Sequence, residues 1–134
     1  MNALPKTCRF IEFQDLSDQR GALVTVEKII PFEIKRLYYL YNQNDKILRG
    51  KHAHKKLEQL IIPIHGSFDL LLDDGKQKAS LSMNNPKQGL YVCPMIWRNL
   101  TNFSSDAVCL VLASECYDEA DYIRNYEEFL YATQ

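Results

Sequence analysis

Short apolar runs, rich in β-branched and aromatic side chains, follow one another along this chain between frequent turn sequences. The turn sequences lie at residues 18–21, 42–45, 73–75 and 84–86. Many short strands at close spacing are typical of a β-sandwich or β-barrel. The runs predict strands at residues 22–30, 35–41, 57–64, 67–73, 77–83, 89–92 and 107–113.

Only the tail of the chain has a helical pattern. Its apolar residues, Tyr122, Ile123, Tyr126, Phe129 and Leu130, recur at steps of three and four, which predicts a helix over residues 118–132. The expected fold is therefore all-β, a jelly-roll barrel with a short C-terminal helix. At 134 residues, the chain has the length of one domain, so we expect a single domain over residues 1–134.

Composition and charge exclude several classes of partner. The formal net charge is -1, so no overall field attracts nucleic acid or an anionic membrane. The N-terminus lacks the apolar segment of a signal peptide, and no apolar run is long enough to cross a bilayer. The four cysteines show no Cys-x-x-Cys spacing, and Cys93 and Cys109 lie in apolar runs. We expect a cytoplasmic protein with free thiols.

The segment that carries candidate chemistry is Arg49-Gly50-Lys51-His52-Ala53-His54. If it is a strand, side chains alternate between the two faces, so His52 and His54 point the same way. Two imidazoles on one face, beside an arginine, indicate either a metal site or a proton-transfer site.

A metal site would need further ligands. A facial triad could be formed by His52, His54 and Glu58. The later stretch that would supply another histidine, residues 89–99, has Arg98 and Asn99 at the place where that histidine is needed. An arginine is a poor ligand because it stays protonated and repels a cation. We therefore favour acid/base chemistry without a metal, in which histidine both takes and returns a proton and a cation stabilises an enolate.

Residues 49–59, RGKHAHKKLEQ in one-letter code, resemble the signature of the sugar 3,4-ketoisomerases that act on dTDP-4-keto-6-deoxyglucose. The resemblance covers nearly the whole chain, in order and spacing. Its other segments are residues 31–39, 72–75, 89–92 with Pro94 and Trp97, 103–106, 111–114 and 117–124.

This resemblance implies a cupin without metal or other cofactor that moves the ketone of dTDP-4-keto-6-deoxyglucose from C4 to C3 through an enediol. The product would serve the synthesis of deoxyamino sugars for bacterial surface glycans such as O-antigen lipopolysaccharide or S-layer glycan. It also implies a homodimer with exchanged strands, and no nucleic-acid or membrane partner.

The resemblance also suggests roles for single residues. His54 is expected to shuttle the proton between C3 and C4, and His52 to assist it. Arg49 is expected to contact the diphosphate or the sugar. Arg36 and Tyr39 are further candidates, although alternation places Tyr39 on the face opposite to Arg36 unless a bulge intervenes.

The product configuration at C4 divides the family. Arg98, directly after Trp97, resembles the branch that yields the gluco product, whereas Arg20 resembles the galacto branch. We favour the gluco product and include all three residues among the substrate-binding candidates.

Three alternatives remain open. A nucleotide-sugar 3,5-epimerase also uses Arg-Gly-x-His, but such enzymes tend to lack the second histidine and to be longer. A metal-dependent cupin would bind stoichiometric iron or manganese. A non-catalytic cupin would bind the sugar nucleotide without exchanging a proton.

Overall fold

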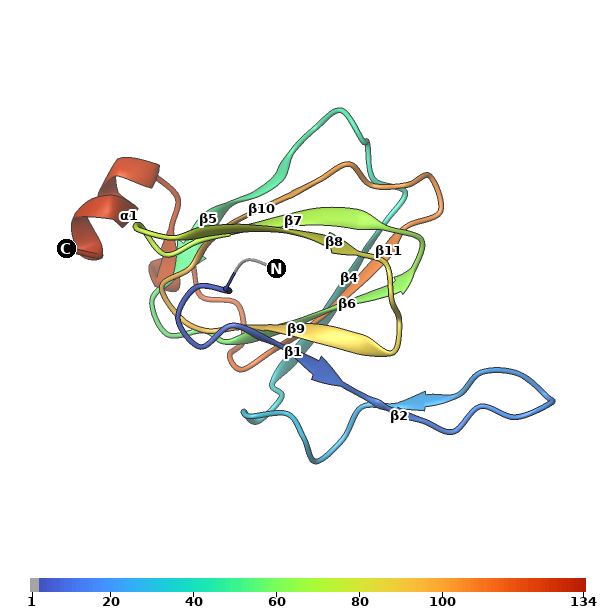
Figure 1. Cartoon of the computed structure of the whole chain (residues 1–134). Helices are drawn as coiled ribbons and strands as arrows, with labels where there is room; N and C mark the ends of the chain where they lie inside the picture. The colour runs from blue at the N-terminus through green and yellow to red at the C-terminus, as the bar shows by residue number, and fades with distance from the viewer. Residues whose placement is uncertain (1–2) are drawn as a thin grey trace.

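Two antiparallel five-stranded sheets enclose the core of the protein, and a short helix lies at one end (Figure 1). The computed structural model describes residues 3–134. The first sheet has the order β1 (Arg9–Glu12), β9 (Gln88–Val92), β6 (Gln59–His65), β11 (Val108–Ala113) and β4 (Arg36–Tyr41). The second has the order β12 (Tyr122–Ile123), β5 (Arg49–His54), β10 (Trp97–Thr101), β7 (Phe68–Asp73) and β8 (Lys78–Met83). The prediction of an all-β fold with a short C-terminal helix is confirmed.

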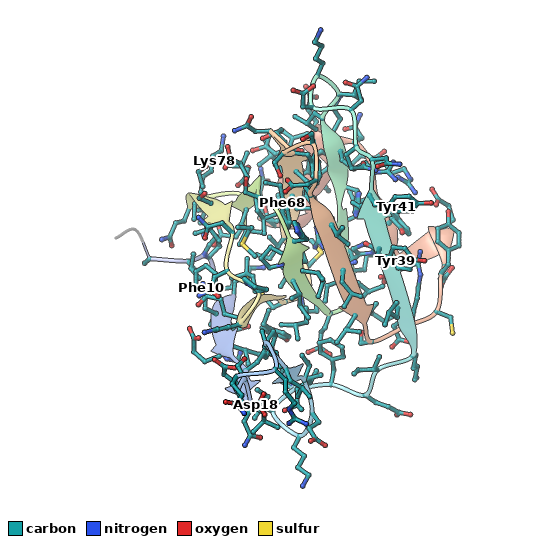
Figure 2. All side chains as sticks on the ribbon, turned by 90° about the vertical axis from the view of Figure 1, so that its right-hand side faces the viewer. Phe10, Asp18, Tyr39, Tyr41, Phe68 and Lys78 are labelled. Atoms are coloured by element: carbon teal, nitrogen blue, oxygen red, sulfur yellow. The ribbon has the colours of Figure 1, made fainter. Side chains whose placement is uncertain are left out.

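Alternation of apolar side chains explains how the sheets pack. Leu60 and Leu90 of the first sheet and Leu70 and Leu72 of the second are fully buried in one cluster. Phe68 joins them in the interior, whereas the side chains of the edge strand β4 that face away from the core are exposed (Figure 2). Burial of this shared apolar surface is the main force that holds the two sheets together.

Most predicted strands are confirmed to within two residues, but one is wrong. Of residues 22–30, only β3 (Val24–Thr25) is a strand, and it pairs with β2 (Gln14–Asp15) in a two-stranded arm that extends from the body (Figure 1). Leu23 and Ile29 are exposed there, so the remaining residues have no sheet to join. Strands β1, β2 and β10 were not predicted, and β5 was considered only as a condition for the placement of His52 and His54.

The predicted helix over residues 118–132 is wrong in its first half. The structure has a 3₁₀ turn (Glu119–Asp121), then β12, and only then the α-helix α1 (Tyr126–Ala132). The side chain of Asn125 accepts a hydrogen bond from Glu128 N and so begins the helix. Tyr122 and Ile123 are apolar because they form a strand beside β5, in which they face opposite sides.

No helix in residues 3–134 is long and apolar enough to cross a membrane. All four cysteines are free thiols, as predicted, and Cys93 and Cys109, which lie in apolar runs, are buried.

Candidate active site

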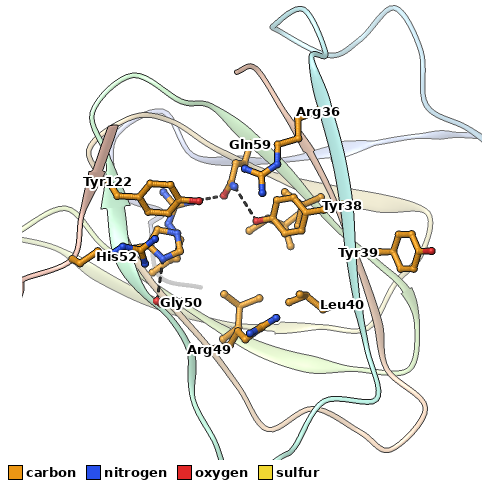
Figure 3. A pocket seen from close by; sticks show the side chains of 14 residues that line it. Arg36, Tyr38, Tyr39, Leu40, Arg49, Gly50, His52, Gln59 and Tyr122 are labelled. Carbon is orange, nitrogen blue, oxygen red and sulfur yellow. Dashed lines mark hydrogen bonds between the residues drawn. The ribbon is translucent and has the colours of Figure 1, made fainter. Parts of the chain in front are cut away.

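A cavity of about 430 Å³ opens between the two sheets, a size that suits a small-molecule ligand (Figure 3). Strands β4 and β6 form one wall, and β5, β10 and β12 form the other. The polar residues that line it are Arg36, Tyr38, Tyr39, Arg49, His52, Gln59, Arg98, Tyr122 and Arg124.

The backbone of β5 explains why a glycine follows Arg49. Gly50 has a φ of +96°, and a Cβ at this position would lie 2.7 Å from the backbone oxygen of Arg98. Lys51 also has a positive φ, of 56°, and the register between β5 and β10 shifts between Arg98 and Asn99. This close approach sets His52 directly opposite Arg98 in the sheet.

The two histidines of β5 point the same way, as predicted, with ring centroids 4.8 Å apart. The Tyr122 ring lies against both, 5.0 Å from His52 and 4.3 Å from His54. His52 lines the cavity, whereas His54 is only 1% exposed and does not belong to the cavity lining. The pair thus has an outer member at the cavity and an inner member behind it.

Both histidines are neutral at neutral pH. Burial, followed by the positive charge of Arg98, lowers the pKa of His52 to about 4 and that of His54 to about 2. The carboxylate of Asp121 lies 3.4 Å from His54 and accepts hydrogen bonds from two backbone N–H groups. Both imidazoles are therefore unprotonated, as a group that takes a proton from a substrate must be.

Arg98 is a buried cation without a counter-charge. It is 2% exposed and donates hydrogen bonds to Ile96 O at 2.9 and 3.3 Å and to the side-chain oxygen of Gln59. Within residues 3–134, no carboxylate lies within 4 Å of its guanidinium. An unpaired buried charge is costly, so this cavity favours a ligand or an intermediate that is negative beside Arg98.

Three more arginines line the cavity. Arg124 is paired with Glu119 at 2.6 Å, whereas Arg36 and Arg49 have no ion-pair partner in residues 3–134 and strengthen the preference for anions. The guanidinium of Arg36 lies 4.7 Å from the centre of the Tyr38 ring, and that of Arg124 lies 4.1 Å from the centre of the Tyr122 ring. Arg49 is exposed at the cavity edge. Planar guanidinium groups suit a diphosphate, which they can bind through two hydrogen bonds at once.

The structure brings four of the predicted site residues, Arg36, Arg49, His52 and Arg98, to one cavity, and places His54 directly behind it. Tyr39 lies at the cavity edge, but its ring points away and is largely exposed, as alternation along the strand predicts (Figure 3).

Two predicted residues lie elsewhere in this chain. Trp97 packs against Tyr126 and Phe129 under helix α1. Arg20 is on the arm, exposed and paired with Asp18. A single chain therefore does not place either of them at the cavity.

Sequence reasoning missed four residues of the site: Gln59, Asp121, Tyr122 and Arg124. Gln59 lies at the end of the recognised 49–59 segment, but only the structure shows that it joins Arg98 to Tyr38, whose hydroxyl accepts from Gln59 Nε2 at 3.1 Å. The other three lie in residues 118–132, where a helix was predicted. A helix there gave no reason to place them beside β5, so they were not recognised as site residues.

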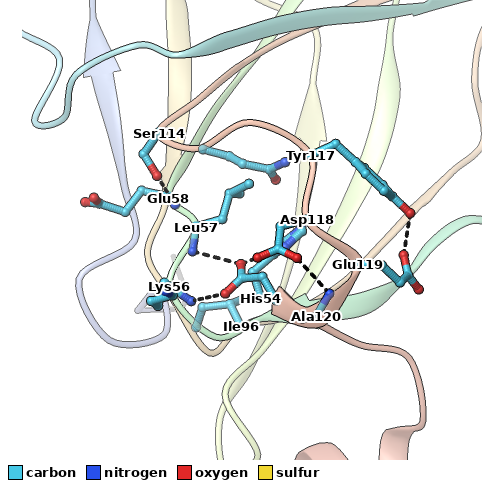
Figure 4. A network of polar contacts seen from close by, with 12 residues as sticks. His54, Lys56, Leu57, Glu58, Ile96, Ser114, Tyr117, Asp118, Glu119 and Ala120 are labelled. Atoms are coloured by element: carbon cyan, nitrogen blue, oxygen red, sulfur yellow. Dashed lines mark hydrogen bonds and ion pairs between the residues drawn. The ribbon is translucent and has the colours of Figure 1, made fainter.

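The residues proposed for a metal triad do not meet. The Glu58 side chain accepts a hydrogen bond from the Tyr91 hydroxyl at 2.5 Å and turns away from His54 (Figure 4). Residues 3–134 contain no group of three His, Cys, Asp or Glu side chains arranged to hold a metal ion.

The lowered histidine pKa values predict a loss of stability in mild acid. Below a pH of about 6.5, His52 and His54 bind protons in the unfolded chain but not in the folded chain. The free energy of unfolding therefore falls as the pH falls. Each histidine contributes a slope of up to about 1.4 kcal/mol per pH unit. Urea titrations between about pH 7 and about pH 5 measure this slope, which His54→Asn is expected to reduce. The exposed His65 supplies the control, His65→Asn, and an equal slope in all three proteins would contradict the assignment.

A family model described as "FdtA: WxcM-like, C-terminal" matches residues 6–134 of the chain. The TDP-4-oxo-6-deoxy-alpha-D-glucose-3,4-oxoisomerase of Aneurinibacillus thermoaerophilus is 47% identical over 123 residues, which cover 90% of this chain and 88% of that protein.

Two solved structures extend the comparison. A histidine-to-asparagine mutant of the 3,4-ketoisomerase QdtA from Thermoanaerobacterium thermosaccharolyticum, in complex with TDP-4-keto-6-deoxyglucose, has a TM-score of 0.94 at 41% identity. That match covers 97% of this chain and 96% of the other. The TDP-quinovose 3,4-ketoisomerase WlaRB from Campylobacter jejuni has a TM-score of 0.90 at 47% identity, over 94% of this chain and 98% of the other.

Proposed function

Since the chain belongs to the FdtA (WxcM-like, C-terminal) family and is an isomerase, we propose that it converts dTDP-4-keto-6-deoxyglucose to the 3-keto isomer. The relatives at 41% and 47% identity are named for this substrate or this reaction. The 3-keto sugar would then supply the synthesis of deoxyamino sugars for bacterial surface glycans.

The proposed reaction moves one proton between neighbouring carbons. A histidine takes the proton from C3, and the electrons of that bond convert the C4 carbonyl into an enediolate. The C3 hydroxyl passes its proton to the C4 oxygen, which becomes a hydroxyl, and the histidine returns its proton to C4, so that C3 becomes the new ketone. We assign the shuttle to His54 and the assisting role to His52.

One observation carries this proposal: the unpaired, buried guanidinium of Arg98 lies beside two neutral imidazoles. The histidines can accept a proton, and Arg98 can stabilise the negative charge that this transfer places on the sugar oxygen. Arg36 and Arg49 at the same cavity, which have no ion-pair partner in residues 3–134, would bind the diphosphate.

A second assignment of the shuttle is favoured by one observation. His52 lines the cavity and His54 does not, so in this alternative His52 meets the substrate and His54 supports it. Single asparagine variants of the two histidines separate the alternatives, because the shuttle variant loses more of the turnover.

We favour the gluco configuration at C4 of the product. Arg98 lies opposite His52 in the sheet, so it is placed to influence how a proton reaches C4. A relative named as a TDP-quinovose 3,4-ketoisomerase shares 47% of its residues with this chain, which supports the preference.

The proposed assembly is a homodimer with exchanged strands. What supports it is exposed apolar surface: Leu37, Tyr39 and Tyr41 on β4, and Leu16 and Leu23 on the arm, are each about half exposed. In such a dimer, the arm of one chain would carry Arg20 to its partner. Light scattering on the purified protein is expected to give twice the mass of the 15.6 kDa chain, and a monomer would contradict the proposal.

An assay with the purified protein and dTDP-4-keto-6-deoxyglucose tests the activity directly. A new 3-keto sugar nucleotide is expected, and activity that survives a chelator argues against the metal-dependent cupin. Inversion at C5 or C3 without ketone movement would instead identify an epimerase, and binding without turnover a non-catalytic module.

A further inference from the structure

Asp121 is a buried carboxylate that holds the turn after β5 in place. It is 6% exposed, and its Oδ1 and Oδ2 accept hydrogen bonds from Lys56 N at 2.8 Å and Leu57 N at 3.1 Å. Figure 4 draws these two bonds as dashed lines that start at Lys56 and Leu57. The backbone oxygen of Asp121 accepts a third, from Lys55 N at 2.9 Å. Three consecutive N–H groups therefore fix its position.

The same carboxylate lies beside His54. Asp121 Oδ2 is 3.4 Å from His54 Nδ1, and neither ring nitrogen of His54 has a hydrogen bond within residues 3–134. The distance is longer than a well-formed hydrogen bond, and such bonds at active sites often shorten only when substrate binds. Because a carboxylate can only accept, the hydrogen of the neutral His54 ring belongs on Nδ1, which leaves the lone pair on Nε2.

His52 has the same tautomer but a different partner. Its Nδ1 is 3.0 Å from the carbonyl oxygen of Gly50, which also can only accept. Both rings thus keep Nε2 free to take a proton. Only His54, however, has a carboxylate behind it that would stabilise the imidazolium formed when the ring takes the proton.

The surrounding charges make that carboxylate necessary. Arg98, Arg36 and Arg124, together with His52 whenever that ring is protonated, disfavour a positive charge on His54. Asp121 is the only acidic side chain within 4 Å of its ring nitrogens in the part of the chain that the structure describes.

We infer that Asp121 is a positioning residue that holds His54 in the Nδ1–H tautomer and stabilises its protonated form during isomerisation. This inference deepens the proposed function and rests on it for the catalytic role, although the tautomer itself can be measured independently of activity.

The variant Asp121→Asn tests the inference. An amide keeps the size of the side chain and one acceptor for the backbone N–H groups but loses the negative charge, and with its NH₂ group at the Oδ2 position it would present a donor to His54 Nδ1. The ring hydrogen then moves to Nε2, so the ring can no longer take the substrate proton there. We expect kcat to fall by about 10²- to 10⁴-fold, as general-base losses typically do.

Nitrogen-15 NMR of histidine-labelled protein gives a readout that a merely structural role would not change. In the wild type, the ring signals that disappear in His54→Asn are expected to show a protonated Nδ1 and a bare Nε2. In Asp121→Asn, the hydrogen is expected on Nε2, and Nδ1 is expected to be bare. The matched control is Asp73→Asn, because Asp73 is also buried but bonds Tyr126 and Gly75 rather than a histidine.

Two results would overturn the inference. One is a hydrogen on Nε2 of His54 in the wild type, which needs no variant and holds even if Asp121→Asn fails to fold. The other is a folded Asp121→Asn protein with the kcat of Asp73→Asn. A wild type without isomerase activity but with the expected tautomer would instead refute the proposed function and leave the placement of the hydrogen intact.

Discussion

Replacing His54 with asparagine is expected to lower kcat by about 10²- to 10⁴-fold and to leave the fold intact. Asparagine is smaller than histidine and still polar, so it fits the buried site, but it cannot take and return a proton. Initial rates with dTDP-4-keto-6-deoxyglucose measure the loss, and thermal unfolding followed by circular dichroism checks the fold.

Two further variants make this result specific. His65→Asn removes an exposed histidine at the far end of β6 and is expected to keep wild-type turnover. His52→Asn is expected to be impaired less than His54→Asn. Full activity in a folded His54→Asn protein would refute the assignment of His54, and a greater loss in His52→Asn would transfer the shuttle to the residue that lines the cavity.

Replacing Arg98 with methionine is expected to lower kcat by about 10²- to 10³-fold, the usual effect of removing one donor that stabilises a developing oxyanion. Methionine fills much of the same volume without charge. Because the charge of Arg98 lowers the pKa of both histidines, the pKa of His52 is also expected to rise above about 4. NMR titration of the ring measures that rise.

Arg9→Met is the matched control for Arg98→Met. Arg9 lies over the Tyr91 ring at 4.8 Å, exposed and outside the cavity, so its loss is expected to change neither turnover nor the histidine pKa values. An Arg98→Met protein that matches Arg9→Met in kcat would contradict the role of Arg98 in stabilising the enediolate.

Local patterns predicted much of the fold and part of the site. Alternation of side chains along residues 35–41 predicted that Tyr39 turns away from the face that carries Arg36, and the structure agrees. The same rule placed His52 and His54 on one face of β5. These features follow from the two-residue period of a strand, which does not depend on distant parts of the chain.

The features that the sequence did not predict depend on contacts between distant segments. Tyr122 is a strand residue because β5 supplies a partner 68 residues earlier, at His54, and an isolated peptide with the same apolar spacing would favour a helix. Asp121 is a site residue for the same reason. Arg20 belongs to an arm that leaves the body, so no pattern within one chain shows what that arm contacts.

The measurement that tests the central claim most directly is an NMR time course with dTDP-4-keto-6-deoxyglucose in deuterated water. We predict a new 3-keto species that carries deuterium at C4. In the fraction of the product that carries hydrogen at C4, the proton couplings are expected to identify the gluco configuration. Deuterium at C5 without ketone movement would contradict the claim in favour of an epimerase. Binding of the sugar nucleotide without any exchange would contradict it in favour of a non-catalytic module.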